Sequence, residues 1–206
     1  MVLGLLLGAC SSSTTSGSSS TTAPTGTTAD DPEPHWPAPA DPMARAVAAG
    51  LVPETHESLQ HHVHAHLDVF VDGVHQTVPA GVGIKIDDPA VHSGPGPAYG
   101  GISPACAEPC ISPLHTHDTS GVLHTESATD VDNTLGQFFV EWGVKLDGQC
   151  VGEYCSPGTP VAVYVDGQPV APDAAAVNGI ALLDRREIAV VIGSPPAAIP
   201  KTFPGA

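Results

Sequence analysis

The sequence predicts a mainly β fold of the α+β class. We expect a small antiparallel β domain with strand-turn-strand units and two short helices, placed after a disordered tether. The stretch His61–Val71 alternates strictly between apolar and polar side chains, as in a half-buried strand. Asp72-Gly73 and Asp166-Gly167 each follow a β-branched run and are typical of tight hairpin turns. Leu114–Glu126 carries a third turn signal between two short arms.

The chain begins with a short apolar stretch that ends in Leu7-Gly8-Ala9-Cys10. This tetrapeptide resembles the lipobox of bacterial lipoproteins, and the resemblance implies that residues 1–10 are a signal segment and that Cys10 carries the lipid. Residues 11–39 are rich in Ser, Thr and Pro and cannot bury a core, so we expect a flexible tether. One globular domain is then expected over 40–193 and a Pro-rich tail over 194–206.

These features place the expected protein at the extracytoplasmic face of the cell membrane, held by its lipid. The formal net charge is −16, and the chain has six Lys and Arg together. Such a chain has no basic patch for nucleic acid or for an anionic membrane surface. The sequence therefore predicts no nucleic-acid partner and no membrane contact other than the anchor, and it leaves any protein partner open.

Four further cysteines form an even set in a compartment that favours oxidation. Four cysteines allow three pairings. We favour the two local bridges Cys106–Cys110 and Cys150–Cys155, because each closes a short loop rich in Pro or Gly. The alternative is that these thiolates are metal ligands.

Two short helices are expected. Asp41 is a good N-cap and is followed by Pro, so a helix should cover Met43–Ala49. Thr134 and Gln137 have the spacing of a capping box. Leu135–Trp142 should then be helical, with an apolar stripe that packs in the core.

Further strands are expected after the first one. A returning strand at Val74–Val78 should pair with it, and Ile84–Ile86 should form a short strand before an irregular loop over Asp87–Pro113. Val161–Gly167 repeats the pattern of Leu67–Gly73, which suggests a weak internal repeat without its histidines. Ile188–Ile192 should be a last buried strand.

The hairpin Leu114–Glu126 places chemistry-bearing side chains together. If its loop is Asp118–Gly121, His115 opposes His124 and His117 opposes Val122. Alternate residues of a strand share a face, and opposed pairs have Cβ atoms about 4.5–5.5 Å apart. Three imidazoles and the Glu126 carboxylate would therefore lie on one face, close enough to bind one ion.

A second row of imidazoles, from His62, His64 and His66, lies along the first strand. Imidazole suits zinc and copper, so we predict a metal site with His115, His117 and His124 as principal ligands. His64 or His66 would complete it if the two strands are adjacent. Asp118 and Glu126 would orient the imidazoles from outside the ligand set. The alternative is that both rows are polar strand faces.

Three motifs carry a family resemblance: residues 62–73 (HVHAHLDVFVDG), residues 114–121 (LHTHDTSG) with His124 and Glu126, and residues 134–139 (TLGQFF). They resemble a set of uncharacterised bacterial and archaeal secreted or lipid-anchored proteins, over roughly residues 61–193. The resemblance implies one domain with a shared site and names no reaction.

Three functions remain open at this point. The first is capture or sensing of zinc or copper at the cell surface. The second is an enzyme that uses the same ion, with Asp118 or Glu126 as general base for a metal-bound water. The third is a metal-free interaction module whose histidines are structural.

Overall fold

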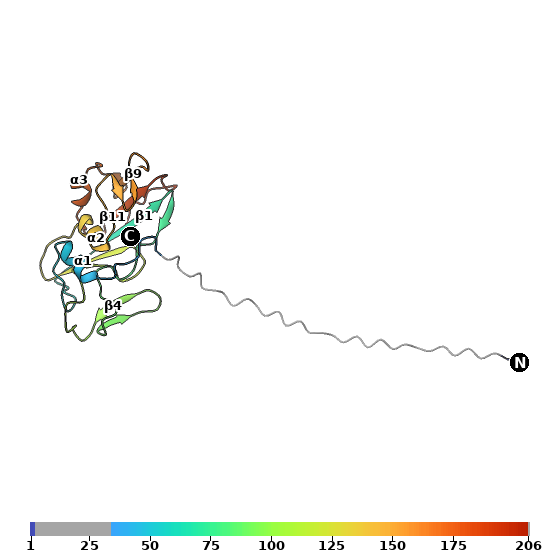
Figure 1. The fold of residues 1–206 in the computed structure, drawn as a ribbon, viewed down its shortest axis with the longest axis horizontal. Coiled ribbons are helices and arrows are strands. Elements are labelled where there is room, and N and C mark those ends of the chain that lie inside the picture. The colour runs from blue at the N-terminus through green and yellow to red at the C-terminus, as the bar shows by residue number, and fades with distance from the viewer. Residues whose placement is uncertain (3–33, 206) are drawn as a thin grey trace. The chain divides into compact units, whose positions relative to one another are not determined.

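The computed structural model describes residues 1–2 and 34–205 of the 206-residue chain. Cys10 and most of the expected tether lie outside the described residues. Residues 34–205 form the mainly β structure that the sequence predicts, with short helices beside the strands (Figure 1). Among the described residues, no helix is both long and apolar enough to cross a bilayer.

The main sheet has seven strands. Its order is β10-β9-β11-β1-β6-β5. Strand β2 pairs with the last three residues of β1, beyond the part of β1 that pairs with β6. The strands are β1 (His61–Val71), β2 (Val74–Gln76), β5 (Leu114–His115), β6 (Val122–Ser127), β9 (Val161–Val165), β10 (Gln168–Pro169) and β11 (Glu187–Ile192). Strand β1 has the predicted bounds and lies in the interior of the sheet, between β6 and β11.

One pairing departs from the antiparallel sheet that was expected. Strand β11 runs parallel to β1, with His66 beside Glu187 and Val71 beside Ile192. The chain leaves the β9–β10 hairpin through a third helix, α3 (Ala174–Asn178), and re-enters the sheet in the same direction as β1. Helix α3 was not expected, because five residues are too few to show a helical period.

Helices α1 (Pro42–Ala48) and α2 (Leu135–Trp142) begin as their caps predict. The Asp41 carboxylate accepts a hydrogen bond from the Ala44 backbone N–H. Thr134 and Gln137 form both bonds of the capping box, and Gly143 ends α2 in the left-handed conformation with φ +86°. These two caps fix the residues at which α2 begins and ends.

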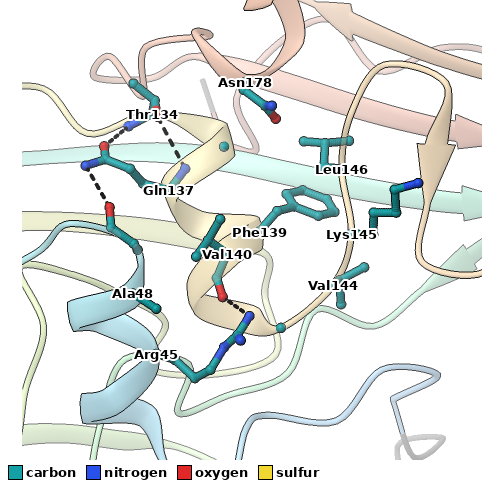
Figure 2. Close-up of a pocket in the computed structure, with 13 residues that line it drawn as sticks. Arg45, Ala48, Thr134, Gln137, Phe139, Val140, Val144, Lys145, Leu146 and Asn178 are labelled. Atoms are coloured by element: carbon teal, nitrogen blue, oxygen red, sulfur yellow. Dashed lines mark hydrogen bonds between the residues drawn. The ribbon is translucent and has the colours of Figure 1, made fainter. Parts of the chain in front are cut away.

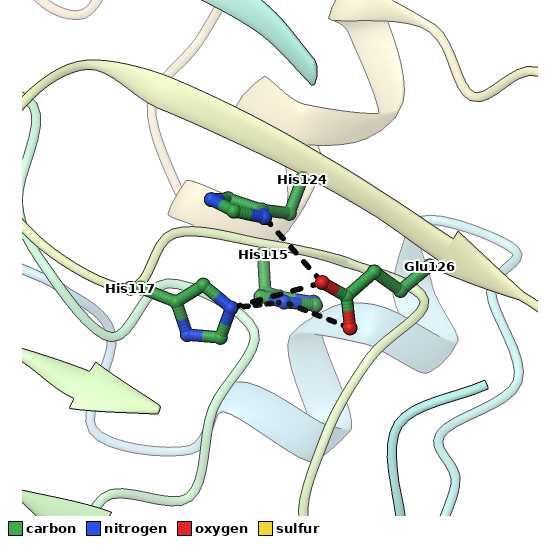
Figure 3. A group of neighbouring side chains, drawn as sticks. All are labelled: His115, His117, His124 and Glu126. Carbon is green, nitrogen blue, oxygen red and sulfur yellow. Dashed lines mark hydrogen bonds and ion pairs between the residues drawn. The ribbon is translucent and has the colours of Figure 1, made fainter. Parts of the chain in front are cut away.

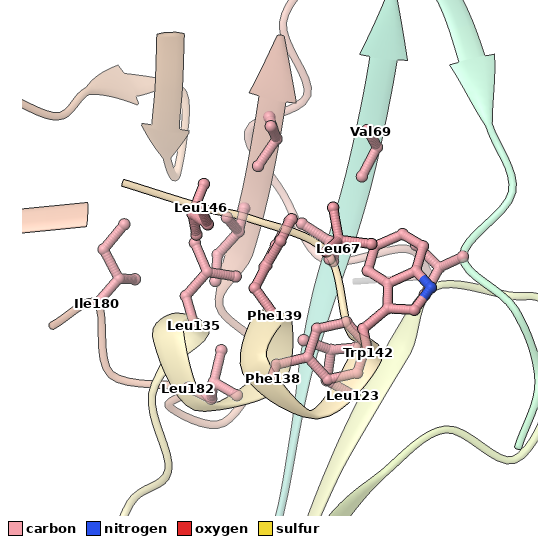
Figure 4. Packing of buried hydrophobic residues seen from close by; sticks show 14 of the residues in the cluster. Leu67, Val69, Leu123, Leu135, Phe138, Phe139, Trp142, Leu146, Ile180 and Leu182 are labelled. Carbon is pink, nitrogen blue, oxygen red and sulfur yellow. The ribbon is translucent and has the colours of Figure 1, made fainter. Parts of the chain in front are cut away.

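The core lies between α2 and the apolar face of the sheet (Figure 4). Leu67 and Val69 of β1 and Leu123 of β6 are buried against Phe139 and Trp142 of α2. This packing follows from the period of two in β1, which sends Ala65, Leu67 and Val69 to the helix side. Its other side chains then share the opposite face of the sheet.

That opposite face has two parts. Phe70, Ala189 and Val191 form a small apolar cluster, against which Ile199 of the C-terminal segment packs. The rest, near β5 and β6, carries the histidines. We call this part the histidine face and define it by His62, His64, His115, His117, His124 and Glu126.

The two Asp-Gly turns have the predicted conformation. Asp72 and Gly73 have φ values of +49° and +80°, and Asp166 and Gly167 have +50° and +76°. Positive φ at both central residues defines the type I′ turn, which suits the twist of a hairpin. The repeated pattern thus forms two similar hairpins, β1–β2 and β9–β10.

The segment expected as an irregular loop contains a small antiparallel sheet of β3 (Val91–Ser93) and β4 (Tyr99–Ile102). Another two-stranded sheet pairs β7 (Cys150–Val151) with β8 (Tyr154–Cys155). The expected strand at Ile84–Ile86 is reduced to one bridge between Ile84 and Ile111. Both favoured disulfides, Cys106–Cys110 and Cys150–Cys155, are present.

Both ends of the packed region extend beyond the expected domain limits. Trp36 packs against the core, and its carbonyl accepts a hydrogen bond from Trp142 Nε1 at 3.0 Å. At the other end, the ring of Phe203 lies 6.1 Å from that of His66. The contacts of these two aromatic rings hold the Pro-rich segments against the domain.

Candidate metal centre

The central strand pairings assemble the histidine face. In the antiparallel pair β5–β6, His115 is opposite His124, as the hairpin register predicts. In the antiparallel pair β1–β6, His64 is also opposite His124, and His62 is opposite Glu126. The two predicted rows of histidines therefore meet on β6.

His117 reaches the cluster by a different route. Strand β5 ends at His115, so His117 has no strand partner at Val122. It lies against β4, and its carbonyl accepts a hydrogen bond from the Tyr99 N–H at 2.8 Å. This contact keeps the imidazole on the same side as His115.

Four side chains form a group that could hold a metal ion: His115, His117, His124 and Glu126 (Figure 3). The Nε2 atoms of His115 and His117 are 3.2 Å apart. Glu126 Oε1 is 3.4 Å from His124 Nδ1 and 3.9 Å from His117 Nε2, and Oε2 is 3.9 Å from His115 Nε2. Zinc–nitrogen bonds of about 2.0–2.1 Å in a tetrahedron place ligand atoms about 3.4 Å apart.

Two backbone carbonyls orient the imidazoles. His115 Nδ1 donates to the Ser112 carbonyl at 2.9 Å, and His117 Nδ1 donates to the Tyr99 carbonyl at 2.5 Å. A carbonyl only accepts, so both Nδ1 atoms carry hydrogen. In the neutral rings, both Nε2 lone pairs then point toward Glu126, as in a prepared metal site.

Two polar atoms of this group are buried without a hydrogen-bond partner among the described residues. They are His124 Nδ1 and Glu126 Oε2. A buried polar atom without a partner costs roughly 1–3 kcal/mol, so native proteins rarely leave one unpaired. A cation at the centre of the group would bind both atoms.

The environment biases the protonation of each group. Burial, and then the charge of His117, lowers the pKa of His115 to about 3. Burial also lowers the pKa of His117, but hydrogen bonds with Glu126 and the Tyr99 carbonyl outweigh it, and the net shift is upward. Burial raises the pKa of Glu126, but its histidine neighbours outweigh that effect and lower it overall. Glu126 is therefore anionic at neutral pH.

His62, His64 and His124 form a second group with metal-ligand spacing. His62 Nε2 is 2.9 Å from His64 Nε2 and 3.3 Å from Glu126 Oε1. The rings of His64 and His124 cross at 77° with centroids 4.4 Å apart. This group is more exposed than the first.

His66 is not brought to either of these groups. Its Nδ1 is 3.0 Å from a Glu187 oxygen, and its Nε2 donates to the Ser120 carbonyl at 2.9 Å. With Asp68 and Glu187 it forms a third group that could hold an ion. Both of its ring nitrogens already have partners, which favours an ion pair with Glu187.

The two carboxylates expected outside the ligand set differ in position. Asp118 is exposed and accepts a hydrogen bond from the Ser120 N–H at 2.9 Å, so it stabilises the hairpin turn. Glu126 is inside the cluster, next to four imidazoles. The carbonyls of Ser112 and Tyr99, which have no sequence signature, also orient His115 and His117.

A buried carboxyl group lies behind His115. Glu141 of α2 is fully buried, and a Cβ placed on Gly83 would lie 3.0 Å from its Oε1 and 3.1 Å from the Cβ of His115. Burial raises the pKa of Glu141 to about 8, and Ser112 and Arg45 offset this only in part. Glu141 is therefore protonated at neutral pH.

A pocket of about 600 Å³ lies elsewhere, between α1, α2 and the segment 143–146 (Figure 2). Two of its polar side chains bond to backbone carbonyls: the Arg45 guanidinium donates to the Val140 carbonyl, and Gln137 donates to the Ala49 carbonyl. It shares no residue with the histidine face, so it does not supply a substrate site beside the candidate ligands.

No protein-family model, curated protein or solved structure matches this chain. The histidine face is therefore the feature of this chain that bears on its function.

Proposed function

We propose that this protein is a lipid-anchored extracytoplasmic metal-binding protein that captures or senses zinc or copper. The principal ligands are His115 Nε2, His117 Nε2, His124 Nδ1 and a Glu126 oxygen. The observation that carries the proposal is the pair of buried, unpartnered atoms in this group, His124 Nδ1 and Glu126 Oε2. Imidazole nitrogen and carboxylate oxygen are ligands that both metals accept.

Capture is favoured over catalysis because four protein groups converge on one point. A catalytic zinc site keeps a position open for water, whereas a closed set of four ligands holds the ion. His115 is fully buried and Glu126 nearly so, which also limits access of a substrate to the ion.

The metal proposal is tested by metal content. The full chain is purified without an affinity His-tag, loaded with zinc or copper, desalted and assayed by plasma mass spectrometry. At least one tightly bound ion per chain is expected. The double variant His115→Ala with His117→Ala should lose this ion, whereas His56→Ala with His92→Ala, at two histidines outside the cluster, should keep it.

Because His115 is in the core, its variant could fail to fold. Glu126→Gln serves as the second test, since it keeps the side-chain shape and removes the charge. Binding of no ion by the wild-type chain would contradict the proposal and favour a metal-free interaction module. Full retention of the ion by Glu126→Gln would exclude Glu126 from the ligand set.

The anchor is proposed from Cys10 and its lipobox-like context. Expression in a bacterium that processes lipoproteins should place the wild-type chain in the membrane fraction, with a lipid mass on its N-terminal peptide. Cys10→Ala should move it to the soluble fraction. An unmodified Cys10 in the isolated wild-type protein would exclude the anchor.

A further inference from the structure

His62 and His64 are not needed for the four-ligand site, although they lie against it. On β1 and β6, His64 is opposite His124 and His62 is opposite Glu126. Each member of this pair therefore faces one ligand of the buried ion. His62 Nε2 is only 3.3 Å from Glu126 Oε1.

The second group offers its own set of nitrogens. One nitrogen from each of His62, His64 and His124 lies within 4.8 Å of the others. The contact of 2.9 Å between the Nε2 atoms of His62 and His64 is a hydrogen bond in which one ring donates and the other accepts. An ion would replace the shared proton after a small rotation of the more exposed His62 ring.

His124 is able to serve both groups. Its Nδ1 faces Glu126 Oε1, and its other ring nitrogen points away from Glu126 (Figure 3). Imidazole has two nitrogens, and each can bind an ion when both are deprotonated. Glu126 also lies between the two groups, because its Oε1 is 3.3 Å from His62 Nε2 and 3.4 Å from His124 Nδ1.

Carboxylates around the cluster supply charge for more than one cation. Asp184 Oδ1 accepts a hydrogen bond from the backbone N–H of His64 at 3.2 Å. Asp118 and Glu57 act electrostatically on His117. With Glu126, these carboxylates make four negative groups around five imidazoles, and two divalent ions carry four positive charges.

We propose that the histidine face binds two divalent transition-metal ions side by side. The first is held by His115, His117, His124 and Glu126, and the second by His62, His64 and His124, with His124 and Glu126 between them. This inference rests on the proposed function. The second ion has three protein ligands at the exposed edge of the cluster, so a coordination position is open to water or an external anion. The buried ion fills first, and the exposed ion exchanges faster.

The test counts ions and measures their coupling. Metal-free full-length protein is titrated calorimetrically with zinc, and with copper under the same conditions. Two ions per wild-type chain are expected, and one for His62→Gln with His64→Gln. The matched control His56→Gln with His92→Gln replaces two histidines outside the cluster and should still bind two.

The outcomes separate this inference from the proposed function. One ion in the wild type would overturn the two-ion centre and leave the four-ligand site in place, whereas no ion would overturn both. Two ions in the His62→Gln with His64→Gln chain would overturn the assignment of the second site. In copper-loaded wild type, the paramagnetic resonance intensity per ion should fall as the second equivalent binds, because the ions share ligands. Full intensity from two ions would overturn the shared centre.

Discussion

His64 and His124 face each other across the antiparallel pair β1–β6, with ring centroids 4.4 Å apart. On its other side, His124 faces His115 across β5–β6. One residue of the middle strand thus joins candidate ligands from two segments that are about 50 residues apart in the chain. Removal of His124 should therefore disturb both ions, whereas removal of His62 and His64 should disturb one.

Glu126→Gln should weaken binding of the first zinc ion by about 100-fold or more. The amide keeps the shape but removes the only carboxylate of the ligand set, and outer groups alone can change metal affinity by 10–100-fold. Competition with a zinc chelator measures the effect. Glu108→Gln, at an exposed glutamate, is the control. Equal affinities for the two variants would exclude Glu126 as a ligand.

Zinc affinity should rise with pH from 5 to 7.5. His117, whose pKa is raised, must release its proton before it binds, whereas His115, with a pKa lowered to about 3, is already neutral. Each released proton changes the apparent affinity about tenfold per pH unit below the pKa of the group. Calorimetry in buffers of different ionisation enthalpy counts these protons. A constant affinity over this range would show that His117 is not a ligand.

Glu141→Gln should stabilise the fold at neutral and higher pH. Burial raises the pKa of Glu141 from 4.5 to about 8 in the folded chain, so the folded state holds the proton between these pH values and the unfolded state does not. The free energy of unfolding then falls as pH rises from 4.5 to 8, by an amount on the order of 3–5 kcal/mol. Denaturant titrations at pH 5 and pH 8 measure it.

The glutamine variant should lose most of this dependence, because it carries no ionisable group at the same place. Glu108→Gln should keep it. If wild type and Glu141→Gln lose stability equally between pH 5 and pH 8, another buried group is responsible.

Gly83→Ala should disturb the ligand strand β5. Gly83 has φ +73°, and a Cβ there would lie 2.4 Å from the Leu114 carbonyl oxygen. Gly96 has the same φ of +73° and nothing within 4 Å, so Gly96→Ala carries only the conformational cost of about 1 kcal/mol. We expect Gly83→Ala to cost about 3 kcal/mol or more. Similar melting temperatures for both variants would argue against this close approach.

The two disulfides should differ in their effect on metal binding. Cys106 and Cys110 pack in the same cluster as Tyr99, whose carbonyl holds His117. Cys106→Ser with Cys110→Ser should weaken zinc binding about tenfold, in line with loss of an orienting partner. Cys150→Ser with Cys155→Ser removes a bridge that closes a loop of similar length and serves as the control. Equal zinc affinities would show that the first bridge does not support the site.

Local patterns predicted the elements that depend on neighbouring residues. The period of two in His61–Val71 sets the bounds and faces of β1, and the turn at Asp118–Gly121 sets the opposition of His115 and His124. The capping box of α2 is a further example. In each case, interactions within a few residues determine the structure.

Features that depend on distant parts of the chain could not be predicted. The parallel pairing of β11 with β1 arises from the path through α3, which is too short to show a period. The carbonyls of Ser112 and Tyr99 orient His115 and His117. Every residue has a backbone carbonyl, so the sequence does not single out these two. Glu141 is protonated because it is buried in the folded chain. The sequence around a helical glutamate does not show whether tertiary packing will bury it. The lipid anchor and the family resemblance stay predictions.

The interior position of β1 has a consequence for how the protein folds. His66 and its partner Glu187 are separated by 121 positions in the chain, so one edge of β1 is completed only when the last strand docks. Folding slows as contacts become more distant in sequence, because a long loop must close before the contact forms. We therefore expect slow folding and a nascent chain whose His-rich segment stays exposed until synthesis is complete. Such a segment can bind metal through the wrong partners, so the order in which folding and metal loading occur should decide the yield of native protein.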